Sequence, residues 1–118
     1  MRTVLATGVF DLLHPGHVLY LEEAGKLGDR LVVIVARDET AEKRKNRIIV
    51  PEKQRLAVVK ALKPVDEAIL GDAKDFYAPV QKIDPDVIVL GKDQHFNEVE
   101  LEEELKNCLL YTSDAADE

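Results

Sequence analysis

The segment Gly8-Val9-Phe10-Asp11-Leu12-Leu13-His14-Pro15-Gly16-His17 is the most informative part of this chain. It follows an apolar run at residues 3–6 and precedes an amphipathic run at residues 18–27. This pattern predicts a strand, a tight loop and then a helix that begins with two imidazoles three residues apart. Because helix N-termini carry free backbone N–H groups and a partial positive charge, the loop is expected to bind an anion such as phosphate.

Individual residues of this loop have distinct physical roles. Gly8 lets the backbone turn or approach a ligand without a Cβ clash. Pro15 suits the first helical position, and His14, which precedes it, is expected to be extended and to cap the helix. His17 then lies on the first turn, close to His14. Both histidines are therefore candidate phosphate ligands.

Two other interpretations of the histidine pair remain open. The HxxH spacing is also compatible with half of a metal site, or with a purely structural role. Zinc-binding helices favour an i,i+4 pair with a nearby acid, and this chain offers only His95 as a third histidine. Phosphate binding is the favoured interpretation, and no residue is assigned as a metal ligand.

The pattern GxFDxxHxGH after a first strand resembles the signature of the cytidylyltransferase-like nucleotidyltransferases. The resemblance implies that His14 and His17 contact the nucleotide triphosphate and stabilise the departing pyrophosphate. The nucleotide-binding loop would comprise Gly8, Val9, Phe10, Asp11 and both histidines. Many members have threonine where this chain has Val9, so a backbone N–H remains as the donor there. Asp11 would align the loop or hold the catalytic metal, or it would simply accept loop N–H bonds.

Length and composition limit the class of protein. The chain has 118 residues, enough for one small domain, and 46% of them are hydrophobic. No apolar run approaches the roughly 18 residues of a membrane span, and no signal peptide is visible. A single cysteine, Cys108, excludes an internal disulfide framework and favours a cytoplasmic location. The net charge of −7 argues against a nucleic-acid-binding surface.

Residues 108–118, CLLYTSDAADE, do not continue the preceding pattern. They resemble the in-frame translation of a sequencing-library adapter, so we interpret them as a non-native tail; the alternative is an ordinary acidic tail. The natural sequence of an interrupted gene would then stop near Asn107, and residues 1–107 would be a single nucleotidyltransferase domain. Without the tail, which holds three carboxylates and no basic residue, the net charge is −4.

The rest of the chain alternates between strands and helices. Strands are predicted at residues 3–6, 30–36, 67–70 and 86–90, and helices at 16–27, 38–42, 51–62, 75–83 and 98–106. The core-facing residues of two helices are predicted to be Leu19, Ala24 and Leu27, and Leu56, Val59 and Leu62. A basic loop is expected at residues 43–50. This order predicts a Rossmann-like three-layer α/β sandwich of the nucleotidyltransferase type, with an open parallel sheet and ligands beyond the carboxyl ends of its strands.

Lys43, Arg44, Lys45 and Arg47 form the densest positive cluster. Such cations can close on a phosphate and release it, although a solvated loop is the plainer interpretation. The resemblance favours Lys43 and Lys45 as ligands of substrate phosphate. It also implies a comparable arginine, Arg55, facing the substrate pocket early in the next helix; the alternative for Arg55 is a surface helix residue.

The run from Val50 to Leu70, together with residues 84–96, resembles the archaeal-type FAD synthase branch of this superfamily. In that segment Gly91 permits close backbone approach to a base or ribose, and Asp93 is a candidate ligand of ribose hydroxyls or a base amino group. Lys92 departs from relatives, which often have an aromatic residue there. The superfamily also carries a Ser/Thr-rich motif near its C-terminus, and nothing after Lys106 matches it, so reduced nucleotide binding and turnover are expected.

This resemblance implies that AMP passes from ATP to FMN to give FAD and pyrophosphate, with a divalent cation, most simply Mg²⁺. Catalytic roles would fall to His14, His17, Lys43 and Arg55, and Lys43, Lys45 and Arg55 would bind the substrate phosphate. Two alternatives are a cytidylyltransferase that uses CTP and a small phosphate ester, glycerol 3-phosphate, and a non-catalytic nucleotide-binding module. The resemblance is also compatible with a homodimer; no nucleic-acid or membrane partner is expected.

Overall fold

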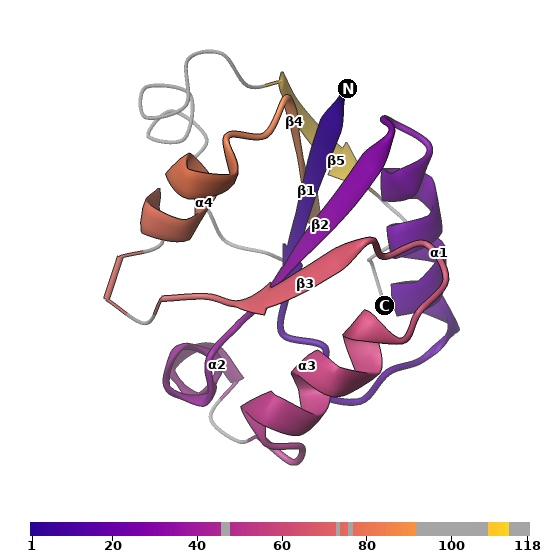
Figure 1. Cartoon of the computed structure of the whole chain (residues 1–118). Coiled ribbons are helices and arrows are strands. Elements are labelled where there is room, and N and C mark those ends of the chain that lie inside the picture. The colour runs from indigo at the N-terminus through magenta and orange to yellow at the C-terminus, as the bar shows by residue number, and fades with distance from the viewer. Residues whose placement is uncertain (46–47, 73, 76, 92–108, 114–118) are drawn as a thin grey trace.

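The computed structural model describes residues 1–45, 48–72, 74–75, 77–91 and 109–113. Within them five parallel strands form one sheet in the order β3-β2-β1-β4-β5 (Figure 1). The strands are β1 (Thr3–Gly8), β2 (Arg30–Val35), β3 (Glu67–Leu70), β4 (Val87–Gly91) and β5 (Leu109–Ser113). Runs of valine, isoleucine and leucine form the central strands because both faces of the sheet are covered.

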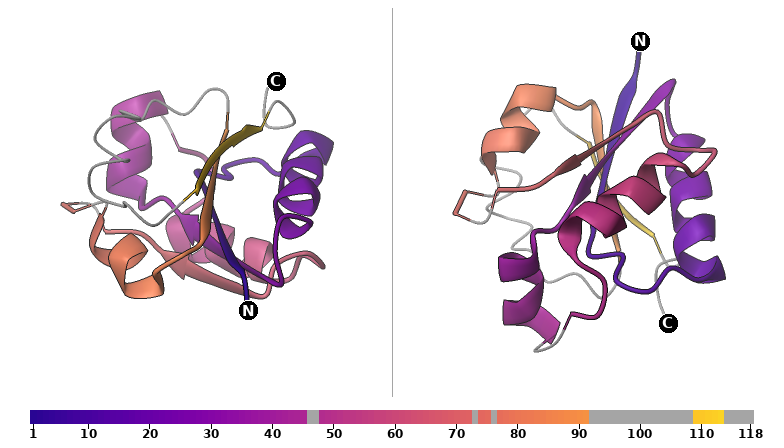
Figure 2. Two further views of the ribbon diagram at one scale, coloured as in Figure 1. Left: turned by 90° about the horizontal axis from the view of Figure 1, so that it is seen from above. Right: turned by 60° about the horizontal axis from the view of Figure 1, so that its bottom comes forward.

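Helices cover both faces of this sheet. The helices are α1 (Pro15–Gly25), α2 (Asp38–Lys45), α3 (Glu52–Lys60) and α4 (Tyr77–Ile83). Side chains of α1 and α3 share one hydrophobic core with the sheet, and Val80 of α4 belongs to a second core. Figure 2 shows the sheet between α1 and α4. The predicted three-layer α/β architecture with an open parallel sheet is confirmed. Among the described residues, no helix is long and apolar enough to cross a bilayer.

The core-facing side of α1 differs from the prediction at one position. The buried residues of this helix are Tyr20, Leu21 and Ala24. Leu19 faces outward and is 49% exposed. The prediction for Leu19 was wrong because Tyr20 takes the inward position. Its hydroxyl lies 3.1 Å from the carbonyl oxygen of Thr7 and 3.0 Å from that of Val89, so a polar tip can be buried there.

The basic segment also begins later than predicted. The helix that starts at Asp38 was predicted to end at residue 42, with a basic loop from Lys43 onward. In the structure this helix, α2, continues through Lys45. Lysine and arginine are good helix formers, and cations are favourable near a helix C-terminus, so a basic sequence need not end the helix. The helix predicted at residues 98–106 lies outside the described residues.

The last strand comes from the segment interpreted above as a non-native tail. It pairs with β4 from Val87↔Leu109 to Gly91↔Ser113. The edge of a sheet exposes unpaired backbone N–H and C=O groups, which can pair with an extended segment of many different sequences. The pairing of β5 with β4 therefore does not show whether residues 108–118 are native. That origin stays a prediction.

The strand order of the sheet reverses beside β1. The chain runs from β1 to β2 and β3 on one side and then returns to place β4 on the other side of β1. β1 pairs with β2 as far as Gly8↔Val35, but its pairing with β4 stops at Ala6↔Val89. The two strands therefore separate toward their carboxyl ends. In open α/β sheets, ligands bind at this kind of reversal in strand order.

Replacing Gly28 by alanine should destabilise the fold. A Cβ at this position would lie 2.7 Å from the carbonyl oxygen of Arg2 and from Cγ2 of Val4, and the backbone would have to shift. We expect the free energy of unfolding to fall by about 1–3 kcal/mol, measured by urea denaturation. Gly25→Ala is the matched control, because its Cβ would meet no atom closer than 3.7 Å. Equal stability of the two variants would contradict the prediction.

Candidate functional site

The two histidines of the loop lie together at the start of α1. His14 is the N-cap, with φ −144° and ψ 173°, and Pro15 takes the first helical position. The rings of His14 and His17 are stacked, with centroids 4.0 Å apart and an interplanar angle of 27°. Both side chains are partly exposed. The expected extended cap and the proximity of the two rings are confirmed.

Capping sets the tautomer of His14. Its Nδ1 accepts a hydrogen bond from the backbone N–H of Gly16 at 3.0 Å. An accepting Nδ1 carries no proton, so in the neutral ring the proton resides on Nε2. His14 thus satisfies one free N–H group of the helix and keeps an N–H donor on the other side of its ring.

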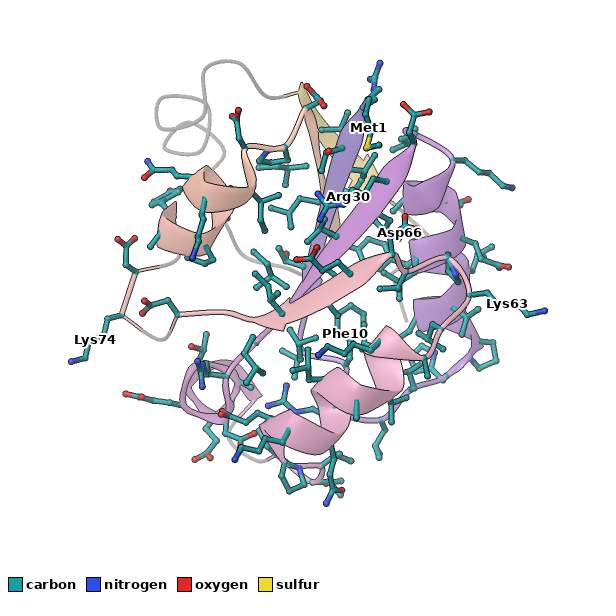
Figure 3. The ribbon with its side chains drawn as sticks, in the orientation of Figure 1. Met1, Phe10, Arg30, Lys63, Asp66 and Lys74 are labelled. Atoms are coloured by element: carbon teal, nitrogen blue, oxygen red, sulfur yellow. The ribbon has the colours of Figure 1, made fainter. Side chains whose placement is uncertain are left out.

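Phe10 supports the histidine pair from inside the protein. Its ring packs edge-on against His17, with centroids 5.5 Å apart. Phe10 is only 3% exposed and lies in the interior between the sheet and α3 (Figure 3). A Cβ on Gly8 would lie 2.8 Å from the Phe10 ring, so this glycine lets the ring fold back over the end of β1. Phe10 has φ 55°, a strained conformation for a residue with a side chain, and such strain is typical of functional loops. The structure thus places the Phe10 side chain inside the protein, against the ring of His17.

Asp11 holds the loop that leads into α3. Its carboxylate accepts hydrogen bonds from the backbone N–H groups of Ile49, at 3.1 and 3.2 Å, and Val50, at 2.8 Å. These contacts are loop N–H bonds, which is the structural alternative considered above for Asp11. The described residues contain no group of three or more acidic, histidine or cysteine side chains that is placed to hold a metal ion.

Arg55 lies inside the protein and organises the edge of the site. Its side chain is 0% exposed. Nε donates to the carbonyl oxygen of Val50 at 2.8 Å, and Nη1 donates to those of Val9 and Ala36 at 2.8 and 2.7 Å. Nη2 forms an ion pair with Asp38 at 2.5 Å. A guanidinium has five N–H donors, so these contacts occupy four of them. Arg55 was expected to face the substrate pocket; the structure shows a buried guanidinium that joins the loops around it.

Three of the remaining candidates have a described backbone. The backbone of Lys43 and Lys45 belongs to the last turn of α2, and Gly91 ends β4. Asp93, and the side chains of Lys43 and Lys45, lie outside what the structure describes.

A hollow of about 520 Å³ opens beyond β3, between the start of α2 and α4; its lining includes Arg37, Gly71, Lys74 and Lys82. Asp72 also lines it, and the backbone N–H groups of Lys74 and Asp75 hold the pKa of its carboxyl below the usual range. Sequence patterns did not indicate a role for Arg37 or Glu52, nor an ion pair for Asp38. Acidic and basic residues near strand ends were the available signal.

Comparison with known proteins identifies the family of this chain. The model of the family described as cytidylyltransferase-like matches residues 5–115, nearly the whole chain. The chain belongs to the cytidylyltransferase-like family. In this cytidylyltransferase-like protein, the loop with the paired histidines follows β1, beside the point where the strand order reverses.

Curated relatives of this chain carry the name FAD synthase. The protein of Ferroglobus placidus is 63% identical over 106 residues, which are 90% of this chain and 69% of the relative. The protein of Archaeoglobus profundus is 58% identical over 112 residues, 95% of this chain and 72% of the relative. A crystal structure described as a lipopolysaccharide core biosynthesis protein from Thermoplasma volcanium is 47% identical, with a TM-score of 0.88, and the match covers 95% of each chain.

Replacing Arg55 by methionine should destabilise this cytidylyltransferase-like protein. The change would leave Asp38 without its ion-pair partner and three carbonyl oxygens without a donor. We expect the free energy of unfolding to fall by about 3 kcal/mol, measured by urea denaturation. Lys53→Met, on the exposed side of the same helix, should change it by less than about 0.5 kcal/mol. A variant at Arg55 as stable as this control would show that the guanidinium does not hold the loops.

Proposed function

We propose that this chain transfers AMP from ATP to FMN, giving FAD and pyrophosphate. The observation that carries the proposal is the identity of 63% over 90% of the chain to a protein named FAD synthase. The local geometry supports it, because two stacked imidazoles stand at the N-terminus of α1, directly after β1, where the strand order of the sheet reverses. Such a site suits a polyphosphate, whose negative charge is distributed over several oxygens.

In the proposed reaction a phosphate oxygen of FMN attacks the α-phosphorus of ATP in line. The bond from the α-phosphorus to the bridging oxygen breaks, and pyrophosphate leaves with the electron pair. Catalysis of this type relies on positioning and on donors directed at the growing negative charge. The Nε2–H of His14 and the ring of His17 would donate to the β- and γ-phosphates. Gly8, Val9 and Asp11 would shape the loop around the nucleotide, with Phe10 as support.

Other parts of the site would bind the second substrate and the rest of the nucleotide. Lys43 and Lys45, at the end of α2, would bind substrate phosphate, while Gly91 and Asp93 would contact the base or ribose. Arg55 would act by holding the Val9 carbonyl and Asp38 in place. We propose that Mg²⁺ arrives with ATP as part of the substrate, because Mg²⁺ in such sites is bound largely by phosphate oxygens and water. We place the reaction in the cytoplasm; a homodimer stays an expectation from the resemblance.

Substrate specificity tests the proposal directly. Purified protein should release pyrophosphate and form FAD with MgATP and FMN, measured by chromatography of the flavin product. CTP with glycerol 3-phosphate should give a rate lower by at least tenfold. A preference for the second pair would favour the cytidylyltransferase alternative. Nucleotide binding with no pyrophosphate released from either pair would favour the non-catalytic module.

Replacing His17 by alanine should lower kcat by about 10²–10³-fold, which corresponds to about 2.7–4 kcal/mol of lost transition-state stabilisation. The reason is the loss of one directed donor to the leaving pyrophosphate. The rate of FAD formation at saturating substrates checks this. Leu19→Ala is the matched control on the same helix, because Leu19 is half exposed and away from the loop. An unchanged kcat in His17→Ala would contradict the proposed role.

A further inference from the structure

The N-terminus of α2 is capped by a residue of another helix. The backbone N–H of Asp38, the first residue of α2, donates to Oε1 of Glu52 at 2.8 Å. Glu52 is the first residue of α3 and lies fourteen positions further along the chain. Its carboxylate therefore supplies the acceptor, and the negative charge, that a helix N-terminus favours. Figure 1 shows α2 and α3 side by side beneath the sheet.

The second oxygen of Glu52 extends this contact to β3. Oε2 accepts from Nη1 of Arg37 at 3.1 Å, and Nε of Arg37 donates to the carbonyl oxygen of Gly71 at 2.7 Å. Gly71 follows the last residue of β3. The carboxylate of Glu52 is 22% exposed, so solvent screens the contact only partly. Glu52 thus joins the start of α2 to the carboxyl end of β3.

Apolar packing contributes little to the position of α2. Among its described side chains, at positions 38–42, Ala41 is the buried one. The polar contacts of Glu52 and the ion pair of Arg55 with Asp38 therefore fix the start of this helix, and both come from α3. Because a helix is rigid over two turns, fixing its start also fixes where its last turn lies. That last turn carries Lys43, Arg44 and Lys45.

We propose that Glu52 is a positioning residue for substrate phosphate. By capping α2 and holding Arg37, it sets the position of the basic last turn of α2 relative to the histidine pair. The inference rests on the proposed function, since it assigns the lysines of α2 to the phosphate of FMN. Glu52 itself contacts no substrate.

The test compares Glu52→Ala, which removes both acceptors, with Glu52→Gln, which keeps a carbonyl oxygen for the Asp38 N–H. In Glu52→Ala we expect the KM for FMN to rise about tenfold, with the KM for ATP and kcat within about threefold of the parent. Amide hydrogen exchange in α2 should speed up about tenfold, with exchange in α1 and β2 unchanged. In Glu52→Gln, the KM for FMN and the exchange rate in α2 should both return most of the way to the values of the parent chain. Gln54→Ala, exposed on the same helix, should change neither.

Combining Glu52→Ala with substitutions of both lysines separates a positioning role of Glu52 from an effect on general stability. If Glu52 acts through the basic turn, adding Glu52→Ala to Lys43→Ala/Lys45→Ala should raise the KM for FMN no further. Independent, multiplicative effects would overturn the inference, as would unchanged exchange in α2. Should Glu52→Ala fail to fold, Glu52→Asp keeps the charge but withdraws the oxygen from the Asp38 N–H, with the same expected results. A parent chain that makes no FAD contradicts the proposed function, and exchange in α2 still tests the capping by Glu52.

Discussion

The guanidinium of Arg55 is a buried cation, and its hydrogen bonds hold together the segments that surround the site. It donates to Val9 in the histidine loop, to Ala36 after β2 and to Val50 before α3, and it pairs with Asp38 at the start of α2. A buried charge is costly unless it is paired and its donors are satisfied. The three carbonyls and the carboxylate must therefore converge on one point, and this convergence gives the loops a defined relative position.

The histidine loop obeys a similar constraint on a smaller scale. His14 caps α1 through Nδ1, Phe10 packs against His17, and Gly8 leaves space for the Phe10 ring. Each contact has a local effect: it gives a free helix N–H an acceptor, or it lets a buried ring pack against its neighbours. Together they place two imidazoles at the N-terminus of α1, directly after β1, where the helix dipole and the reversal in strand order both favour an anion.

Membership of the cytidylyltransferase-like family and the FAD synthase relatives fit this arrangement. An adenylyl transfer without a covalent intermediate demands accurate placement of two anionic substrates. The structure provides it with polar contacts between loops: Asp11 to the segment before α3, Arg55 to three carbonyls, and Glu52 to α2. Apolar packing between helices and sheet stabilises the layers. The charged contacts fix the positions of the loops at the carboxyl ends of the strands.

Local patterns in the chain were sufficient for the layered α/β architecture, the strand at residues 67–70, and the capped helix with its paired histidines. Those features follow from interactions within a few residues: β-branched runs, a proline at the first helical position and a cap beside it. The burial of Arg55 and the inward position of Tyr20 in place of Leu19 depend on partners as far as 46 and 69 residues away along the chain, as the Arg55–Val9 and Tyr20–Val89 contacts show. From sequence alone, a charged residue such as Arg55 is expected to be exposed, because partners such as Val9 are distant along the chain. The inward position of Tyr20 likewise depends on a distant acceptor, so only the tertiary structure decided both features.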